Sequence, residues 1–159
     1  MIDIIAGAKG KGKTKILIQQ VNDDIKLTKG TIVYLDKNNK HMYELSNQIR
    51  LIVVPEFNVT DTDMFLGFIA GIISQDHDLD KIYLDSFLTT ACIDDNLDYA
   101  VENLVLYLTI VVDFVISASV DKENMPESVQ KYVFSRIIIR YYLMQNRPII
   151  LHTWRISGI

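Results

Sequence analysis

The sequence contains a single cysteine, Cys92, among its 159 residues. One cysteine excludes an intramolecular disulfide and a cysteine-rich zinc site, so we expect Cys92 to be a small buried apolar group. The sequence also lacks an excess of basic residues. Its net charge of −4 argues against general binding of nucleic acid, for which a basic surface is expected.

Long uninterrupted apolar runs are absent as well. The longest apolar stretch, Leu104–Val120, contains Asp113 and several other polar residues, which excludes a transmembrane helix. Met1 is followed directly by a strand-like segment rather than by a signal peptide. With one cysteine, no span and no signal, the sequence predicts a cytoplasmic protein.

The strongest motif lies near the N-terminus. Residues 7–14, Gly-Ala-Lys-Gly-Lys-Gly-Lys-Thr, fit the pattern G-x-x-x-x-G-K-[ST]. They follow the apolar run Ile2–Ala6 and precede a helical pattern, which is the context that a phosphate-binding P-loop requires. In such a loop the backbone N–H groups surround the phosphates, the lysine meets the β- and γ-phosphates, and the hydroxyl ligates Mg²⁺. The motif therefore predicts a site for ATP or GTP with Mg²⁺.

The residues predicted to bind the nucleotide are those of this loop and the first turn after it. They are Gly7, Gly10, Lys11, Gly12, Lys13, Thr14 and Lys15. Lys13 is also assigned a catalytic role, because its charge lies at the reacting phosphates. Lys11 and Lys15 are expected to form, with Lys9, a solvated basic rim that attracts an anionic nucleotide.

A second carboxylate is expected beside a P-loop, at the end of an apolar strand. The run Ile82–Asp85 supplies this pattern, so Asp85 is assigned a catalytic role and, together with Thr14, the metal site. Open α/β sheets bind ligands at the edge where their strands end. The alternative interpretation is an aspartate in a surface turn.

The residue after Asp85 bears on hydrolysis. Many P-loop ATPases place a glutamate there, whereas this chain has Ser86, which has no useful basicity near neutral pH. Hydrolysis is then slow, or the base comes from elsewhere. Asp36 is one candidate, although the start of an Asp-Lys-Asn-Asn turn is the simpler interpretation of that residue. Ser117 is either a γ-phosphate sensor or an ordinary serine at the end of a strand.

Strand-like and helical patterns alternate along the chain. Strands are predicted at 2–6, 31–35, 50–54, 81–85 and 113–117, and helices at 13–28, from 60 or 61 to 74, from 94 or 95 to 109, and at 126–133. Residues 41–48 fit either a short strand or helical turns, and Gly67 and Gly71 are expected to allow close helix–sheet packing. This order predicts an α/β fold: a three-layer P-loop NTPase-like fold with a mostly parallel sheet of about five strands.

The end of the chain differs in charge. Residues 134–159 contain four arginines and no acidic residue, so they carry +4, and since the whole chain carries −4, residues 1–133 carry −8. We therefore divide the chain into a nucleotide-binding domain, residues 1–133, and a basic C-terminal extension, residues 134–159. Within the extension, Pro148–Thr153 fits a sixth strand. An edge element, a partner-binding segment and poorly ordered sequence are the alternatives for its role.

The chain resembles a group of small, poorly characterised bacterial P-loop NTPase-like proteins, some labelled "twitching motility protein PilT". The resemblance rests on the loop Gly7–Thr14, the strand ending in Asp85, and the segments Phe68–Ile72 and Phe114–Tyr132. It spans roughly residues 1–133, and from Phe134 onward the chain departs from the pattern. The resemblance implies a P-loop NTPase fold and a nucleotide ligand.

Together these features predict a nucleotide- and Mg²⁺-binding protein that is a slow NTPase or a nucleotide-dependent switch acting on a protein partner. ATP is preferred to GTP because no segment matches the guanine-specificity motif N-K-x-D. One alternative is a small-molecule kinase, but the only lid-like stretch, Asp121–Lys131, lacks the arginines that such a lid usually carries. Another is a non-hydrolysing nucleotide-binding interaction module, with a homo-oligomer as one form.

Overall fold

Five strands rich in β-branched and aromatic residues form one parallel sheet in the computed structural model, which describes residues 1–109 and 111–133. Every strand pair in the sheet is parallel, and the strand order is β1-β5-β4-β2-β3. The α/β fold and the five-stranded sheet expected from the sequence are confirmed. The strands are β1 (Ile2–Ala6), β2 (Thr31–Asp36), β3 (Arg50–Val53), β4 (Leu79–Leu84) and β5 (Asp113–Ala118).

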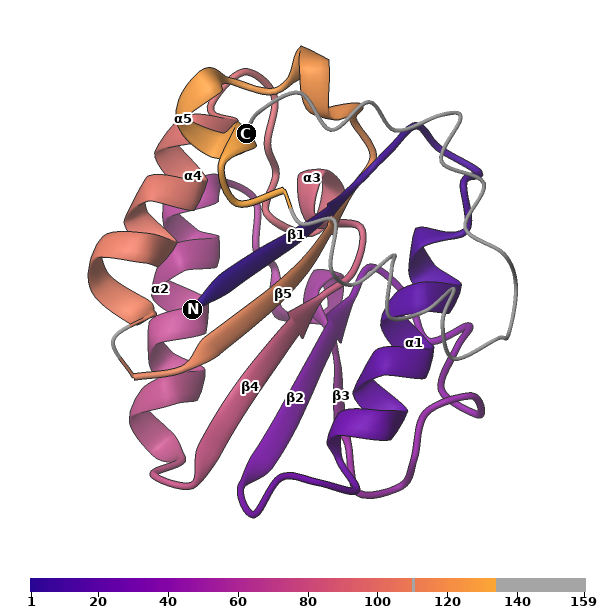
Figure 1. Ribbon diagram of the computed structural model, residues 1–159. Coiled ribbons are helices and arrows are strands. Elements are labelled where there is room, and N and C mark those ends of the chain that lie inside the picture. Colours follow the sequence, from indigo (N-terminus) through magenta and orange to yellow (C-terminus); the bar gives the residue numbers. More distant parts are fainter. Residues whose placement is uncertain (110, 134–159) are drawn as a thin grey trace.

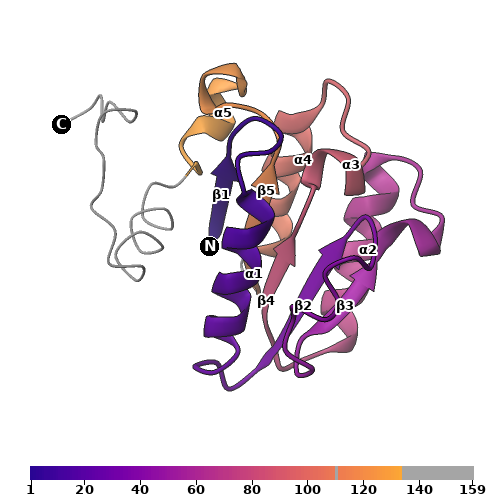
Figure 2. The same cartoon turned by 90° about the vertical axis from the view of Figure 1, so that its right-hand side faces the viewer.

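Helices cover both faces of this sheet (Figures 1 and 2). The helix that follows β1 lies on one face, and the remaining described helices lie on the other side. The helices are α1 (Lys13–Asp24), α2 (Thr62–Gln75), α3 (Phe87–Thr90), α4 (Leu97–Asn103) and α5 (Glu127–Gln130). A π-helical segment, Leu104–Leu108, continues α4. Parallel strands need such crossovers, and the helices bury both faces of the sheet.

The core has two parts because strand residues alternate between the faces of the sheet. Tyr34 and Tyr83 belong to the cluster under α1, and their rings stack with centroids 6.3 Å apart. Leu35 and Leu84, one residue further along the same strands, belong to the larger cluster beneath α2 and α4. The next residues, Asp36 and Asp85, therefore return to the α1 side.

The first predicted helix is too long by four residues. α1 ends at Asp24 rather than Thr28, and Leu27, which lies within the predicted helix, is 74% exposed. The Asp24 carboxylate accepts hydrogen bonds from Lys81 Nζ (2.8 Å) and from Tyr83 Oη (2.6 Å) on β4. These contacts fix the end of the helix against the sheet, and the chain then turns toward β2.

Other element boundaries also differ from the prediction. β2 extends through Asp36, so this residue ends a strand rather than beginning a turn. Residues 41–48 form turns, neither a strand nor a helix. The last predicted helix ends at Gln130, because Tyr132 O accepts a hydrogen bond from Ile4 N (2.8 Å), and Val133 forms a bridge to β1.

The expected close packing at Gly67 and Gly71 is wrong. Both glycines are exposed, and a Cβ atom added at either would meet nothing within 4 Å. α2 instead packs on the sheet through Phe65, Ile69 and Ile72, which are its buried apolar residues.

The predicted basic extension, with its sixth strand at residues 148–153, lies outside the described residues. No helix within residues 1–109 and 111–133 combines the length and the apolar character needed to cross a membrane.

Candidate functional site

The loop between β1 and α1 lies at the edge where the parallel strands end (Figure 1). Gly10 and Gly12 adopt φ angles of +87° and +79°, a left-handed conformation that side-chain-bearing residues rarely take. Gly12 is also the N-cap of α1, and no acidic side chain lies in the first turn of this helix. The free N–H groups and the positive end of the helix dipole favour an anion at this position.

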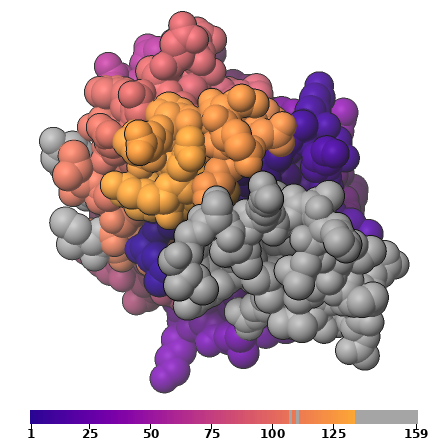
Figure 3. Space-filling model, turned by 45° about the horizontal axis from the view of Figure 1, so that its top comes forward, coloured from indigo at the N-terminus to yellow at the C-terminus, as the bar shows by residue number. Residues whose placement is uncertain are grey.

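The segment after β5 supports the start of this loop. Gly7 N donates to Val120 O (2.9 Å), and Ala8 N donates to Asp121 Oδ1 (3.0 Å). In Figure 3, which turns this edge toward the viewer, the orange segment that follows β5 lies beside the indigo N-terminal segment. Two loops far apart in the sequence therefore form one surface.

Lys13 lies within the loop rather than in solvent, with only 7% of its surface exposed. Its ammonium group donates hydrogen bonds to Gly7 O (2.6 Å) and Ala8 O (2.9 Å). Burial lowers the pKa of Lys13, while the negative charges of Asp85 and Asp121 act in the opposite direction. The loop therefore holds a cation at its centre. By contrast, Lys9, Lys11 and Lys15 are exposed, as expected of a basic rim.

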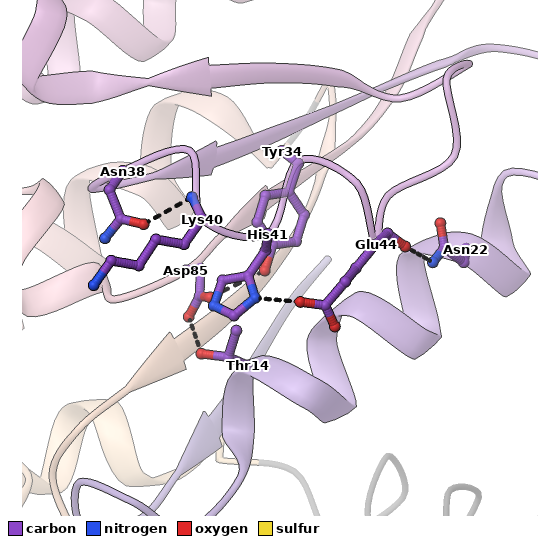
Figure 4. A network of polar contacts seen from close by, with 8 residues as sticks. All are labelled: Thr14, Asn22, Tyr34, Asn38, Lys40, His41, Glu44 and Asp85. Atoms are coloured by element: carbon purple, nitrogen blue, oxygen red, sulfur yellow. Dashed lines mark hydrogen bonds and ion pairs between the residues drawn. The ribbon is translucent and has the colours of Figure 1, made fainter.

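Thr14 and Asp85 meet although they are 71 residues apart in the sequence. Thr14 Oγ1 donates to Asp85 Oδ1 at 3.2 Å, across the space between the first turn of α1 and the end of β4 (Figure 4). β5 separates β1 from β4 in the sheet, so this contact joins the helix that follows β1 to the end of a strand that is not a neighbour of β1. The structure thus places the hydroxyl and the carboxylate assigned to the metal beside each other.

Asp85 is 2% exposed and accepts three further hydrogen bonds. The donors are Tyr34 Oη (3.0 Å) on β2, Ser86 N (2.7 Å) and Ser117 Oγ (2.5 Å) on β5. Ser117 also accepts from Ser86 N at 2.9 Å. Ser117 is therefore a positioning residue for Asp85. The surface-turn interpretation of Asp85 is wrong, because the carboxylate is buried and held from three sides.

Asp36, at the end of β2, is likewise 2% exposed. Its carboxylate accepts a hydrogen bond from the next backbone amide, Lys37 N, at 2.6 Å. Burial and then the negative charge of Asp85 raise the pKa of the Asp36 carboxyl, whereas that hydrogen bond and the charges of His41 and Lys37 act to lower it. Asp36 and Asp85 are thus two buried carboxylates at the ends of adjacent strands.

The loop that follows β2 carries His41 and Glu44 past this group of residues (Figure 4). His41 Nδ1 and Glu44 Oε1 are 2.7 Å apart, and Glu44 O accepts from Asn22 Nδ2 (2.7 Å) on α1. Asn22 Oδ1 in turn accepts from Ser46 N at 2.8 Å. The side chain of Asn22 therefore fastens this loop to the helix that begins at the glycine loop.

The residues present fit a magnesium ion in the manner of a nucleotide site. Mg²⁺ prefers oxygen ligands, keeps several waters, and is usually bound by one or two side chains together with phosphates. The Thr14 hydroxyl and the Asp85 carboxylate supply such oxygens. Across the described residues no group of three or more histidine, cysteine, aspartate or glutamate side chains is placed to hold a metal ion by itself.

The chain was compared with protein-family models and with curated proteins. No protein-family model matches the chain, and no curated protein does either.

Sequence reasoning missed two contributors to the site. Tyr34 was expected only as part of a strand, yet it lies two residues before Asp36 on the same face, and that alternation is a signal of its position. Asp121 was expected only as the start of the lid-like stretch and not as part of the site, and nothing in its local sequence indicates that it contacts Ala8.

Proposed function

We propose that this chain is a P-loop NTPase-like protein that binds a nucleoside triphosphate, preferably ATP, together with Mg²⁺ at the loop Gly7–Thr14. The observation that carries the proposal is the contact between Thr14 Oγ1 and Asp85 Oδ1, beside the buried Lys13. A hydroxyl, a carboxylate and a lysine from a glycine-rich loop are the groups that bind a magnesium–phosphate unit.

Each group has a distinct role in this proposal. The backbone N–H groups of Gly10 to Thr14 surround the phosphates, and Lys13 neutralises charge on the β- and γ-phosphate oxygens. Thr14 and Asp85 would hold Mg²⁺, Thr14 directly and Asp85 through water. Bound Mg²⁺ supplies positive charge that stabilises the charge developing on the phosphate oxygens.

The loops around the site also suit a nucleotide-dependent switch. Asp121 and Val120 contact the start of the glycine loop, and the turn that carries His41 and Glu44 contacts α1. A γ-phosphate between them would bias the positions of both loops, as switch segments do in other nucleotide-binding proteins. We propose that these loops report the nucleotide state to a protein partner and that hydrolysis is slow.

Calorimetric titration of ATP and GTP in the presence of Mg²⁺ tests this proposal. We expect the wild type to bind ATP more tightly than GTP, and Lys13→Ala to raise the dissociation constant at least about tenfold, because a charge-assisted contact is lost. Lys9→Ala is the matched control, since it removes an exposed lysine from the same loop. Wild-type protein that binds neither nucleotide, or equal effects of the two variants, would contradict the proposal.

A further inference from the structure

Asp36 is a buried acid with spare hydrogen-bonding capacity at the proposed nucleotide site. Asp85 accepts four hydrogen bonds, whereas the one hydrogen bond to the Asp36 carboxylate within the described residues comes from Lys37 N. A carboxylate can accept about four hydrogen bonds. Burying a carboxylate to 2% exposure with one such bond lowers the stability of the fold, so a purely structural role does not explain this residue.

The sheet places this carboxylate next to Asp85. Leu35 on β2 is the register partner of Leu84 on β4, so Asp36 and Asp85 follow at the ends of two hydrogen-bonded strands. Adjacent strands lie about 4.8 Å apart. Since Tyr34 and Tyr83 share the cluster under α1, the residues two positions later, Asp36 and Asp85, also lie on the α1 side of the sheet.

Charged groups face the Asp36 carboxyl from two elements. Burial and then the negative charge of Asp85 on β4 raise the pKa of this carboxyl, whereas the hydrogen bond from Lys37 N and the charges of His41 and Lys37 on the following loop act to lower it. Glu44 is hydrogen-bonded to His41 on the same loop. A buried carboxylate in this position can accept a proton from a neighbouring water.

The neighbouring residues leave the role of base to Asp36. Ser86 follows Asp85 at the position where many P-loop ATPases have a glutamate, and its backbone N–H is already bonded to Asp85 and Ser117. Asp85 itself accepts a hydrogen bond from the Thr14 hydroxyl and is assigned to the metal.

We infer that Asp36 is the general base that activates water for hydrolysis of the bound nucleoside triphosphate, an inference that rests on the function proposed above. The water oxygen forms a bond to the γ-phosphorus while its proton passes to Asp36. The bond from that phosphorus to the β,γ-bridging oxygen breaks, and its electron pair leaves on the nucleoside diphosphate. Asp36 then returns the proton to solvent, and the products are a nucleoside diphosphate and inorganic phosphate.

The test combines nucleotide binding with phosphate release for wild type, Asp36→Asn and His41→Gln. Asparagine is nearly the same size as aspartate and still accepts from Lys37 N, so the variant keeps the local contact. We expect Asp36→Asn to bind Mg·ATP with an affinity close to wild type while its turnover number falls about 100-fold, the contribution typical of a general base. His41→Gln is expected to lower turnover far less than Asp36→Asn does, because it removes a charge near Asp36 but leaves the carboxylate in place. Phosphate release by Lys13→Ala gives the background from contaminating enzymes.

Two results overturn the inference without touching the proposed function. One is turnover by Asp36→Asn at the wild-type rate, and the other is wild-type protein that binds Mg·ATP but releases no phosphate above the background. Loss of turnover in His41→Gln with retention in Asp36→Asn would move the base to His41 and overturn it as well. Failure of the wild type to bind nucleotide would instead overturn the proposed function, and the inference with it.

Discussion

Asp85 is the residue on which the contacts of the site converge. Its buried carboxylate joins four segments: the first turn of α1 through Thr14, β2 through Tyr34, β5 through Ser117, and its own strand end through Ser86. A buried acid with this many donors is held in one orientation. Such rigidity is useful for a carboxylate that must bind a metal through water.

The hydrogen bond from Tyr34 gives a prediction about stability. Tyr34→Phe removes the hydroxyl that donates to Asp85 Oδ2 and leaves the ring in place. A hydrogen bond to a buried charged group contributes about 1.5–3 kcal/mol, so we expect the free energy of unfolding to fall by about 2 kcal/mol in urea titrations. Tyr43→Phe is the matched control, because Tyr43 is 91% exposed and should change stability little. Equal effects of the two substitutions would mean that the Asp85 contact does not stabilise the fold.

At the scale of elements, α2 begins with a capping interaction at Asp61, one of the two positions at which the sequence predicts the helix to start. Asp61 has extended backbone angles, and its carboxylate accepts from Met64 N at 2.8 Å. This bond satisfies one of the free N–H groups at the start of the helix. α2 spans the face of the sheet opposite α1, so its stability affects the packing of the larger core cluster.

Replacing this cap should lower stability by a modest amount. We expect Asp61→Ala to reduce the free energy of unfolding by about 1 kcal/mol, while Asp61→Asn, which caps equally well, retains most of it. Denaturant titrations of the three proteins measure the difference. If alanine and asparagine are equivalent, the hydrogen bond to Met64 N contributes nothing measurable to folding.

The elements show how far local sequence patterns predict structure. The β-branched runs at Thr31–Leu35 and Asp113–Ser117 predicted strands at the right places, because such residues suit a buried sheet. The helix predicted to start at residue 60 or 61 corresponds to α2, whose N-cap is Asp61. The predicted end of α1 was wrong because Asp24 accepts hydrogen bonds from Lys81 and Tyr83, which are far away in the sequence.

The site was predictable only in part for the same reason. The glycine loop is a contiguous motif, and Asp85 follows a contiguous apolar strand, so both could be assigned from the sequence. The pairing of Leu35 with Leu84, which brings Asp36 next to Asp85, depends on the order of strands in the sheet. Strand order is a non-local property that no short pattern encodes. Asp36 therefore looked like the start of a turn.

On the scale of the whole molecule, two buried tyrosines couple folding to pH. Burial, with the negative charge of Asp85, raises the pKa of Tyr34, and burial, with the hydrogen bond to Asp24, raises that of Tyr83. The folded pKa of each phenol thus exceeds its unfolded value of 10.0. The stability that the neutral phenols provide is complete below pH 10 and is lost as the pH rises further, since only the unfolded chain ionises.

We therefore expect the free energy of unfolding to decrease above pH 10 by about 1.4 kcal/mol per pH unit for each of these tyrosines. Lys13, whose pKa is lowered, acts in the opposite direction up to its ordinary value of 10.5, so the decline is clearest above that pH. Urea titrations between pH 8 and 11.5 measure it. A variant with Tyr34→Phe and Tyr83→Phe should show a flatter profile, and an unchanged slope in that variant would refute the assignment.

The proposed function depends most directly on the binding of nucleotide phosphates by the glycine loop. Two-dimensional ¹H–¹⁵N NMR of the chain during titration with Mg·ATP tests this claim residue by residue. We expect the largest chemical-shift changes at the backbone amides of Gly10 to Thr14, with smaller changes at Ser86 and Val120. Saturating Mg·ATP that leaves the loop amides unchanged, or that shifts a different surface, would contradict it.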